Sequence, residues 1–171
     1  MVKKRIFSFL ITLIVLISFC GCNAKNAIED ASENIKQGSE NTKSNSTDLI
    51  EKIKDTPMDY SKDEFKKDLD NKGLKAEKLD STKPFFSVKS EDYKIVGGSL
   101  SVYEYETSDK DKIISDMKTI SDNGTVINGT KISWSKAPHI YKKGRVVVIY
   151  DGDNESTLTS LKEILGEPLI G

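Results

Sequence analysis

Apolar residues are so unevenly spread along this chain that only its C-terminal part can build a hydrophobic core. Residues 6–19 form one apolar run, interrupted only by serine and threonine. Residues 23–46 carry few apolar side chains and consist mainly of Asn, Lys, Glu, Ser and Asp. Such a stretch buries too little apolar surface to offset the entropy lost on folding, so we expect it to be disordered. The sequence therefore predicts one folded domain over residues 57–171.

The N-terminal apolar run has the flanks of a secretory signal. Lys3, Lys4 and Arg5 precede it, and its 14 residues are fewer than the roughly 20 that a helix needs to cross a bilayer. A short basic segment, a short apolar run and a small residue before the cleavage point are typical of a cleavable signal peptide. We therefore expect residues 1–21 to be removed.

The sequence Phe19-Cys20-Gly21-Cys22 resembles the lipobox of bacterial lipoproteins, in which a small residue directly precedes the cysteine that receives the lipid. Gly21 is that small residue, whereas the bulky Phe19 precedes Cys20. The resemblance implies cleavage after Gly21 and a diacylglyceryl thioether on Cys22. Two alternatives stay open, namely an uncleaved signal anchor and a secretory signal without lipid.

A lipid on Cys22 would anchor the mature chain to the cell membrane, facing outside the cytoplasm. Each buried methylene contributes about 0.8 kcal/mol, so two acyl chains hold firmly where one would not. Residues 22–56 would then be the lipidated N-terminus and a flexible tether. Because Cys22 would be the only thiol left, no disulfide could stabilise the domain.

The charge of the mature chain argues against nucleic acid as a partner. Removing residues 1–21 leaves 23 Lys and Arg against 27 Asp and Glu, a net charge of −4, with Arg145 as the one remaining arginine. Domains that bind nucleic acid carry a basic surface instead. The expected partners are the membrane, through the lipid, and an envelope protein or a cell-wall component.

Three segments have the apolar spacing and the end signals of helices. Residues 60–73 begin with Ser61 and Glu64 as a capping box. Residues 108–121 begin with Ser108 and Asp111 as a capping pair, and residues 153–165 form the third helix.

The segments between these helices are rich in β-branched and aromatic residues and are bounded by turn residues. Asn128-Gly129 predicts a hairpin, and Lys142-Lys143-Gly144 a second one. Val146–Ile149 is continuously apolar, as a central strand covered on both faces would be. We expect an α+β fold, a mainly antiparallel sheet with about three helices on one face. The expected strands are residues 74–79, 85–88, 93–96, 99–106, 125–127, 130–134, 139–141 and 145–150.

The part from Phe85 to Gly171 carries a second set of notable residues: Phe86-Ser87-Val88, Val102-Tyr103-Glu104-Tyr105, Ile120-Ser121, Asn123-Gly124, Trp134, Pro138-His139-Ile140-Tyr141, Gly144, Val146–Tyr150, Gly152, Leu165-Gly166 and Gly171. With these residues the chain resembles a group of small bacterial envelope lipoproteins that have one compact C-terminal domain and no assigned role. The resemblance implies a lipid-anchored envelope protein and transfers no catalytic or ligand-binding residue.

Five aromatic residues are the best candidates for a binding surface. Tyr103 and Tyr105 share one face of an expected strand, and His139 and Tyr141 share one face of another. If those strands are neighbours, these residues and Trp134 would form an aromatic surface suited to a sugar, a peptide or a partner protein. The alternative is that they are core residues with their polar tips at the edge of the sheet.

His139 is the one histidine of the chain. Zinc sites generally need three or four protein ligands, so a single imidazole predicts no metal and no cofactor. A hydrolase that uses His139 with a serine or an acid is an alternative function, but no Gly-x-Ser-x-Gly elbow accompanies it. We expect His139 to be packed beside Pro138.

Two acidic features have structural explanations. Asp151, Asp153 and Glu155 match the first positions of a calcium loop, but the glycine that the loop needs is absent, so a helix cap at Asp153 or Asn154 is favoured. Glu104 lies on an apolar strand face, so we expect it at the sheet edge or paired, with Arg145 or a lysine.

The sequence thus predicts a non-enzymatic binding or interaction module of the cell envelope. The motivation is the anchor, the tether, the small domain and the lack of a recognisable catalytic motif. Two alternatives stay open: an envelope hydrolase using His139, and a structural or accessory subunit of an envelope complex.

Overall fold

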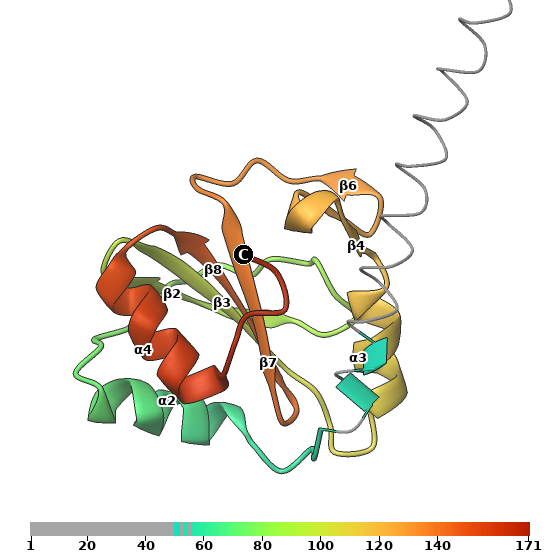
Figure 1. The fold of residues 1–171 in the computed structure, drawn as a ribbon, viewed down its shortest axis with the longest axis horizontal. Helices are drawn as coiled ribbons and strands as arrows, with labels where there is room; N and C mark the ends of the chain where they lie inside the picture. The colour runs from blue at the N-terminus through green and yellow to red at the C-terminus, as the bar shows by residue number, and fades with distance from the viewer. Residues whose placement is uncertain (1–49, 52, 55) are drawn as a thin grey trace, which may run out of the picture. The chain divides into compact units, whose positions relative to one another are not determined.

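The computed structural model describes residues 50–51, 53–54 and 56–171 (Figure 1). The predicted signal peptide, Cys22 and most of the predicted tether lie outside these residues. The helices and strands of the described part follow in this order: α2 (Lys62–Asn71), β1 (Glu77–Lys78), β2 (Ser90–Ile95), β3 (Gly98–Glu104), α3 (Lys110–Met117), β4 (Ile120–Ser121), the 3₁₀ turn η1 (Asp122–Gly124), β5 (Val126–Ile127), β6 (Thr130–Lys131), β7 (Pro138–Lys143), β8 (Val146–Gly152) and α4 (Glu155–Leu165).

The main sheet has five antiparallel strands in the order β1-β2-β3-β8-β7, and β4, β5 and β6 form a small second sheet. The α+β prediction is therefore confirmed. Strand β8 lies between β3 and β7, where Val147 pairs with both Tyr103 and Lys142. The prediction that Val146–Ile149 forms a central strand is also confirmed.

Helices cover both faces of the main sheet, so the expectation of helices on one face is wrong (Figure 1). On the α2/α4 face, the two helices pack on Val146 and Val148. On the α3 face, α3 and the small sheet pack on Val147 and Ile149. A strand that is apolar at every position needs cover on both faces, and this requirement already argues against a one-sided arrangement.

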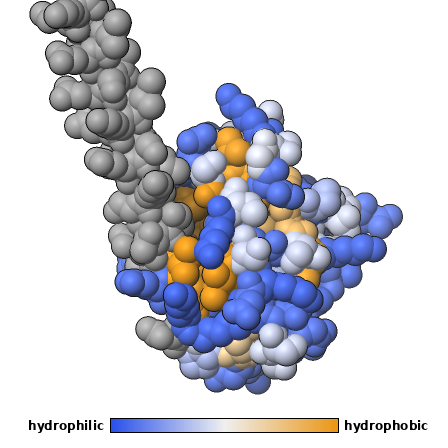
Figure 2. Space-filling view, turned by 90° about the vertical axis from the view of Figure 1, so that its right-hand side faces the viewer, coloured by the Kyte–Doolittle hydropathy of each residue, from blue (hydrophilic) through white to orange (hydrophobic). Residues whose placement is uncertain are grey.

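The side of the molecule that carries α3 shows several hydrophobic residues between hydrophilic ones (Figure 2). Half-buried apolar side chains pack around the buried residues of this face, namely Met58, Phe85, Val88, Ile114, Ile132, Trp134, Leu169 and Ile170. Ile53 is fully buried among them, although it lies inside the predicted tether. The packed domain therefore begins before Pro57.

Local signals predict some ends of elements and miss others. Ser61 and Glu64 form the expected capping box of α2, and Asn154 caps α4 by accepting a hydrogen bond from the Thr157 N–H. The expected Ser108 cap of α3 is wrong, since its N-cap residue is Asp109 and that side chain makes no capping bond. The expected hairpin at Asn128-Gly129 joins β5 to β6.

Three expected strands are absent or reduced to two residues. Residues 85–88 form bends, because Phe86 packs into the α3 face while Ser87 donates to the Asp116 carboxylate at 2.6 Å. Residues 74–79 contribute only β1, and residues 130–134 only β6. The second hairpin turns at Gly144-Arg145 and not over residues 142–144, because β7 continues to Lys143, which still pairs with Val146.

Candidate functional site

The five predicted aromatic residues do not form one surface. Strand β8 separates β3 from β7, so the tyrosines of these strands are not neighbours. Tyr103 and Tyr105 lie on the α3 face, whereas Tyr141 lies on the α2/α4 face. All three are at most 1% exposed. Their placement is that of core residues, the alternative that the sequence left open.

Trp134 and His139 are both half-buried, and they contact different residues. The Trp134 indole N–H donates to the Gly124 carbonyl at 2.9 Å, and its ring meets Phe85 edge-on at 5.4 Å. His139 stacks on Tyr150 at 6.2 Å between ring centres, and burial lowers the pKa of its imidazole. Within the described residues, no hydrogen bond or ion pair joins His139 to a serine or an acid. The alternative of a hydrolase that uses His139 therefore gains no support from a paired acid or nucleophile.

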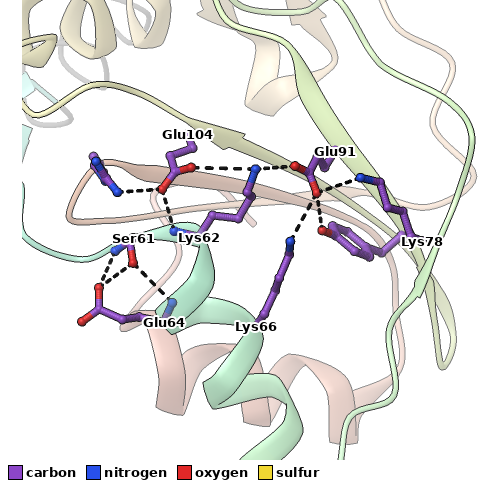
Figure 3. A network of polar contacts seen from close by, with 9 residues as sticks. Ser61, Lys62, Glu64, Lys66, Lys78, Glu91 and Glu104 are labelled. Carbon is purple, nitrogen blue, oxygen red and sulfur yellow. Dashed lines mark hydrogen bonds and ion pairs between the residues drawn. The ribbon is translucent and has the colours of Figure 1, made fainter.

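A cluster of charged residues joins α2 to the main sheet (Figure 3). The Glu91 carboxylate contacts the ammonium groups of Lys62, Lys66 and Lys78, the latter two at 3.4 and 3.3 Å. It also accepts a hydrogen bond from the Tyr93 hydroxyl at 2.7 Å. Hydrogen bonds from Lys62 and Tyr93 hold the pKa of Glu91 well below its usual range. At neutral pH this carboxylate is therefore ionised and surrounded by positive charge.

Glu104 extends the same cluster toward the β7–β8 hairpin (Figure 3). Its carboxylate pairs with Arg145 at 3.1 Å and accepts the backbone N–H of Lys62 at 2.9 Å. The prediction that Glu104 is paired is therefore confirmed. Because these groups are partly exposed, each pair contributes only about 0–1 kcal/mol. Their main effect is to fix the first turn of α2 against β2 and β3.

Beside this cluster lies a polar cleft of about 440 Å³, at the edge of the sheet where the chain leaves β1. We call it the β1-edge cleft. Its floor and rim combine hydroxyl groups, two carboxylates and one ammonium with a single apolar side chain. The lining residues are Lys78, Leu79, Asp80, Ser81, Thr82, Ser90 and Glu91.

A buried acid orients two of the lining hydroxyls. Asp92 is 1% exposed, and its two carboxylate oxygens accept hydrogen bonds from Ser90 at 2.8 Å and from Ser81 at 2.9 Å. The Lys83 N–H donates in turn to the Ser90 hydroxyl at 2.6 Å. Because both serine protons point at Asp92, the free lone pair of Ser81 is left to accept from a ligand. The cleft therefore offers fixed acceptors next to the Lys78 ammonium.

Sequence reasoning missed this cleft for a physical reason. Ser81 and Asp92 are eleven residues apart and meet only because the chain after β1 runs back along the start of β2. The sequence carries one hint of the cleft, the polar run Ser90-Glu91-Asp92. These residues begin strand β2, in which Ser90 and Asp92 are buried.

Comparison of the chain with models of protein families, with curated proteins and with solved structures finds no significant match. Over residues 50–51, 53–54 and 56–171, no three His, Cys, Asp or Glu side chains are grouped so that they could hold a metal ion. None of the helices in that part of the chain has the length and apolar character needed to span a membrane.

Proposed function

We propose that this protein is a lipid-anchored binding module of the cell envelope, held outside the cytoplasm through Cys22, and that the β1-edge cleft takes its ligand. The lipobox-like residues at the N-terminus support the anchor. The oriented hydroxyls and charges of the cleft support binding rather than chemistry, because they hold acceptors and a cation in place without a paired acid and base. The cleft is the observation that carries the proposal.

The lining favours a hydroxylated ligand such as a cell-wall glycan. Its volume falls within the roughly 300–1,000 Å³ of known ligand pockets. Asp80 and the Ser81 lone pair accept hydrogen bonds from hydroxyl groups, and Lys78 donates to ring or hydroxyl oxygens. Leu79, which is 37% exposed, offers an apolar surface for the C–H face of a sugar.

A test of the cleft fills it with a large side chain. Thr82 is exposed at the rim, so Thr82→Trp blocks the cleft without disturbing the core. We expect this variant of the full-length lipidated protein to bind isolated cell-wall glycan at least tenfold more weakly than the wild type, as measured by co-sedimentation. Thr159→Trp, at an exposed position of α4, is the matched control and should bind normally. Equal binding by both variants, with unchanged thermal stability, would contradict the cleft as the ligand site.

The anchor is tested separately from the cleft. Cells fed a fatty-acid analogue should label the wild-type protein and leave Cys22→Ser unlabelled. Absence of label on the wild type, or equal label on both forms, would rule out lipid on Cys22.

A further inference from the structure

Helix α3 begins without a side-chain acceptor for its free N–H groups. The first residues of any α-helix leave N–H groups unpaired and carry a partial positive charge. In α2 and α4 a capping side chain accepts one of them, but Asp109 at the start of α3 does not, and its carboxylate pairs with Lys112 at 3.0 Å. The N–H groups of residues 110–112 have no acceptor within the described part of the chain.

Lys142 on β7 carries a buried ammonium group without a partner. The residue is 9% exposed, and its Nζ is buried and makes no hydrogen bond within the described residues. Burying a charge without a counter-charge is strongly unfavourable. Burial, and then the nearby charge of Lys110, lower the pKa of Lys142 to about 8. At neutral pH this position therefore holds an enclosed cation, which is less favourable for folding than an apolar side chain of the same size.

These two features lie at the same end of the same face of the sheet. Lys142 is on the strand face of Ile140, which packs with Ile113 and Met117 of α3. Strand β3 ends where Glu104 pairs with Val146, next to the pair of Lys142 and Val147. The chain then turns and enters α3 a few residues later, with Lys110 as its first residue.

We propose that the N-terminus of α3 and Lys142 form a binding site for an oxyanion, a carboxylate or phosphate group of a ligand or partner. The anion accepts hydrogen bonds from the free N–H groups of α3, and its charge offsets both the helix dipole and the Lys142 ammonium. The flexible four-carbon stem of Lys142 lets Nζ reach the bound oxygens. The acids nearest in sequence do not fill this role, since Asp109 pairs with Lys112 and Asp111 is exposed.

This oxyanion site is independent of the β1-edge cleft. Strand β7 and strand β1 lie at opposite edges of the main sheet. A failure of one proposal therefore leaves the other standing, because a variant at one edge does not touch the lining of the other.

The test is a titration of the full-length protein with inorganic phosphate and, separately, with acetate, at constant ionic strength set by chloride. Amide chemical shifts of residues 110–112 report binding at the helix, and the thermal unfolding midpoint reports stabilisation. We expect saturable shifts with at least one anion, together with a rise in the midpoint. Lys142→Met should weaken that binding at least tenfold. Lys118→Met, at the exposed C-terminal end of α3, removes the same charge and should bind like the wild type.

The result separates the two sources of the anion. Saturation by acetate alone supports a carboxylate partner, and stronger saturation by phosphate supports a phosphorylated one. Should Lys142→Met fold poorly, Lys142→Gln replaces it as the test variant. The proposal is overturned if neither anion gives saturable shifts, or if the Lys142 variant binds as tightly as Lys118→Met.

Discussion

On the α2/α4 face, Glu91 and Glu104 carry charges that are surrounded by cations, whereas on the α3 face Lys142 carries a buried charge that has no counter-ion. The paired charges are partly exposed and join elements far apart in the sequence. The Lys142 ammonium is almost fully enclosed and links no two elements of the described part of the chain. Charge on the first face therefore serves the fold, while charge on the second opposes it and calls for a functional explanation.

The largest effect on stability is expected from a change in the hydrophobic core of the α2/α4 face. Phe65 is 1% exposed and holds α2 on the sheet under the charged cluster. Phe65→Ala should lower the free energy of unfolding by about 3–5 kcal/mol through lost burial and the cavity left behind. Leu79→Ala, at a partly exposed position, is the control and should cost far less. Urea denaturation measures both, and equal losses would show that α2 is not held by its core.

Removing the unpaired charge should stabilise the protein. Lys142→Met keeps the apolar stem and deletes the ammonium, so we expect about 1–3 kcal/mol more stability at pH 7. A folded pKa of about 8 lies below the ordinary 10.5, so the wild type releases this proton earlier than its unfolded chain does. Its stability should therefore rise between about pH 8 and 10.

The methionine variant should lose this rise in stability with pH. Above pH 10 the trend reverses in both proteins, because burial raises the pKa of Tyr105 and the unfolded chain ionises first. Urea denaturation at several pH values checks the pattern. A destabilised variant would mean that Lys142 has a partner.

Glu91→Gln should have a smaller effect of the opposite sign. The variant leaves Lys62, Lys66 and Lys78 without their shared carboxylate, which costs about 1 kcal/mol at pH 7 because the groups are partly exposed. The pKa of Glu91 is depressed in the folded state, so its contribution is present above about pH 4.5 and is lost as the pH falls further. Acid denaturation should thus be less steep in the variant. Identical acid profiles would contradict the role of the cluster.

The smallest effect is expected for an exposed pair between the two helices of the same face. Lys72 and Glu163 lie 2.6 Å apart, but both side chains are largely in solvent. Lys72→Gln should change the free energy of unfolding by less than about 0.5 kcal/mol. A loss as large as that of Glu91→Gln would mean that solvent-exposed pairs, not the cluster, hold α2 in place.

Sequence predicted what depends on near neighbours in the chain. The capping box at Ser61 and Glu64 and the turn at Asn128-Gly129 need only a few residues, and both are present. The continuously apolar run Val146–Ile149 likewise predicted a central strand, and it forms part of β8. The order and register of the strands cannot be read from the sequence. They pair Tyr103 with Val147 and Tyr141 with Val148, and so place the two tyrosines on opposite faces of the sheet.

The candidate sites were hidden for the same reason. Asp92 becomes a buried acceptor only when the chain after β1 brings Ser81 to it. Lys142 reads in the sequence as an ordinary turn lysine near Gly144, but it lies on the α3 face of β7 and is only 9% exposed. Neither contact has a periodicity or a motif that the sequence displays.

The contrast between the two faces is tested most directly by measuring two lysine pKa values in the same molecule. Tyr93, and then Glu91, raise the pKa of Lys66 above its ordinary value, while burial lowers that of Lys142. NMR titration of the side-chain signals of the full-length protein, assigned with Lys66→Met and Lys142→Met, gives both. We predict that Lys142 titrates near pH 8 and Lys66 above 10.5. Titration of Lys142 at or above 10.5 would contradict it, because its ammonium would then be hydrated or paired.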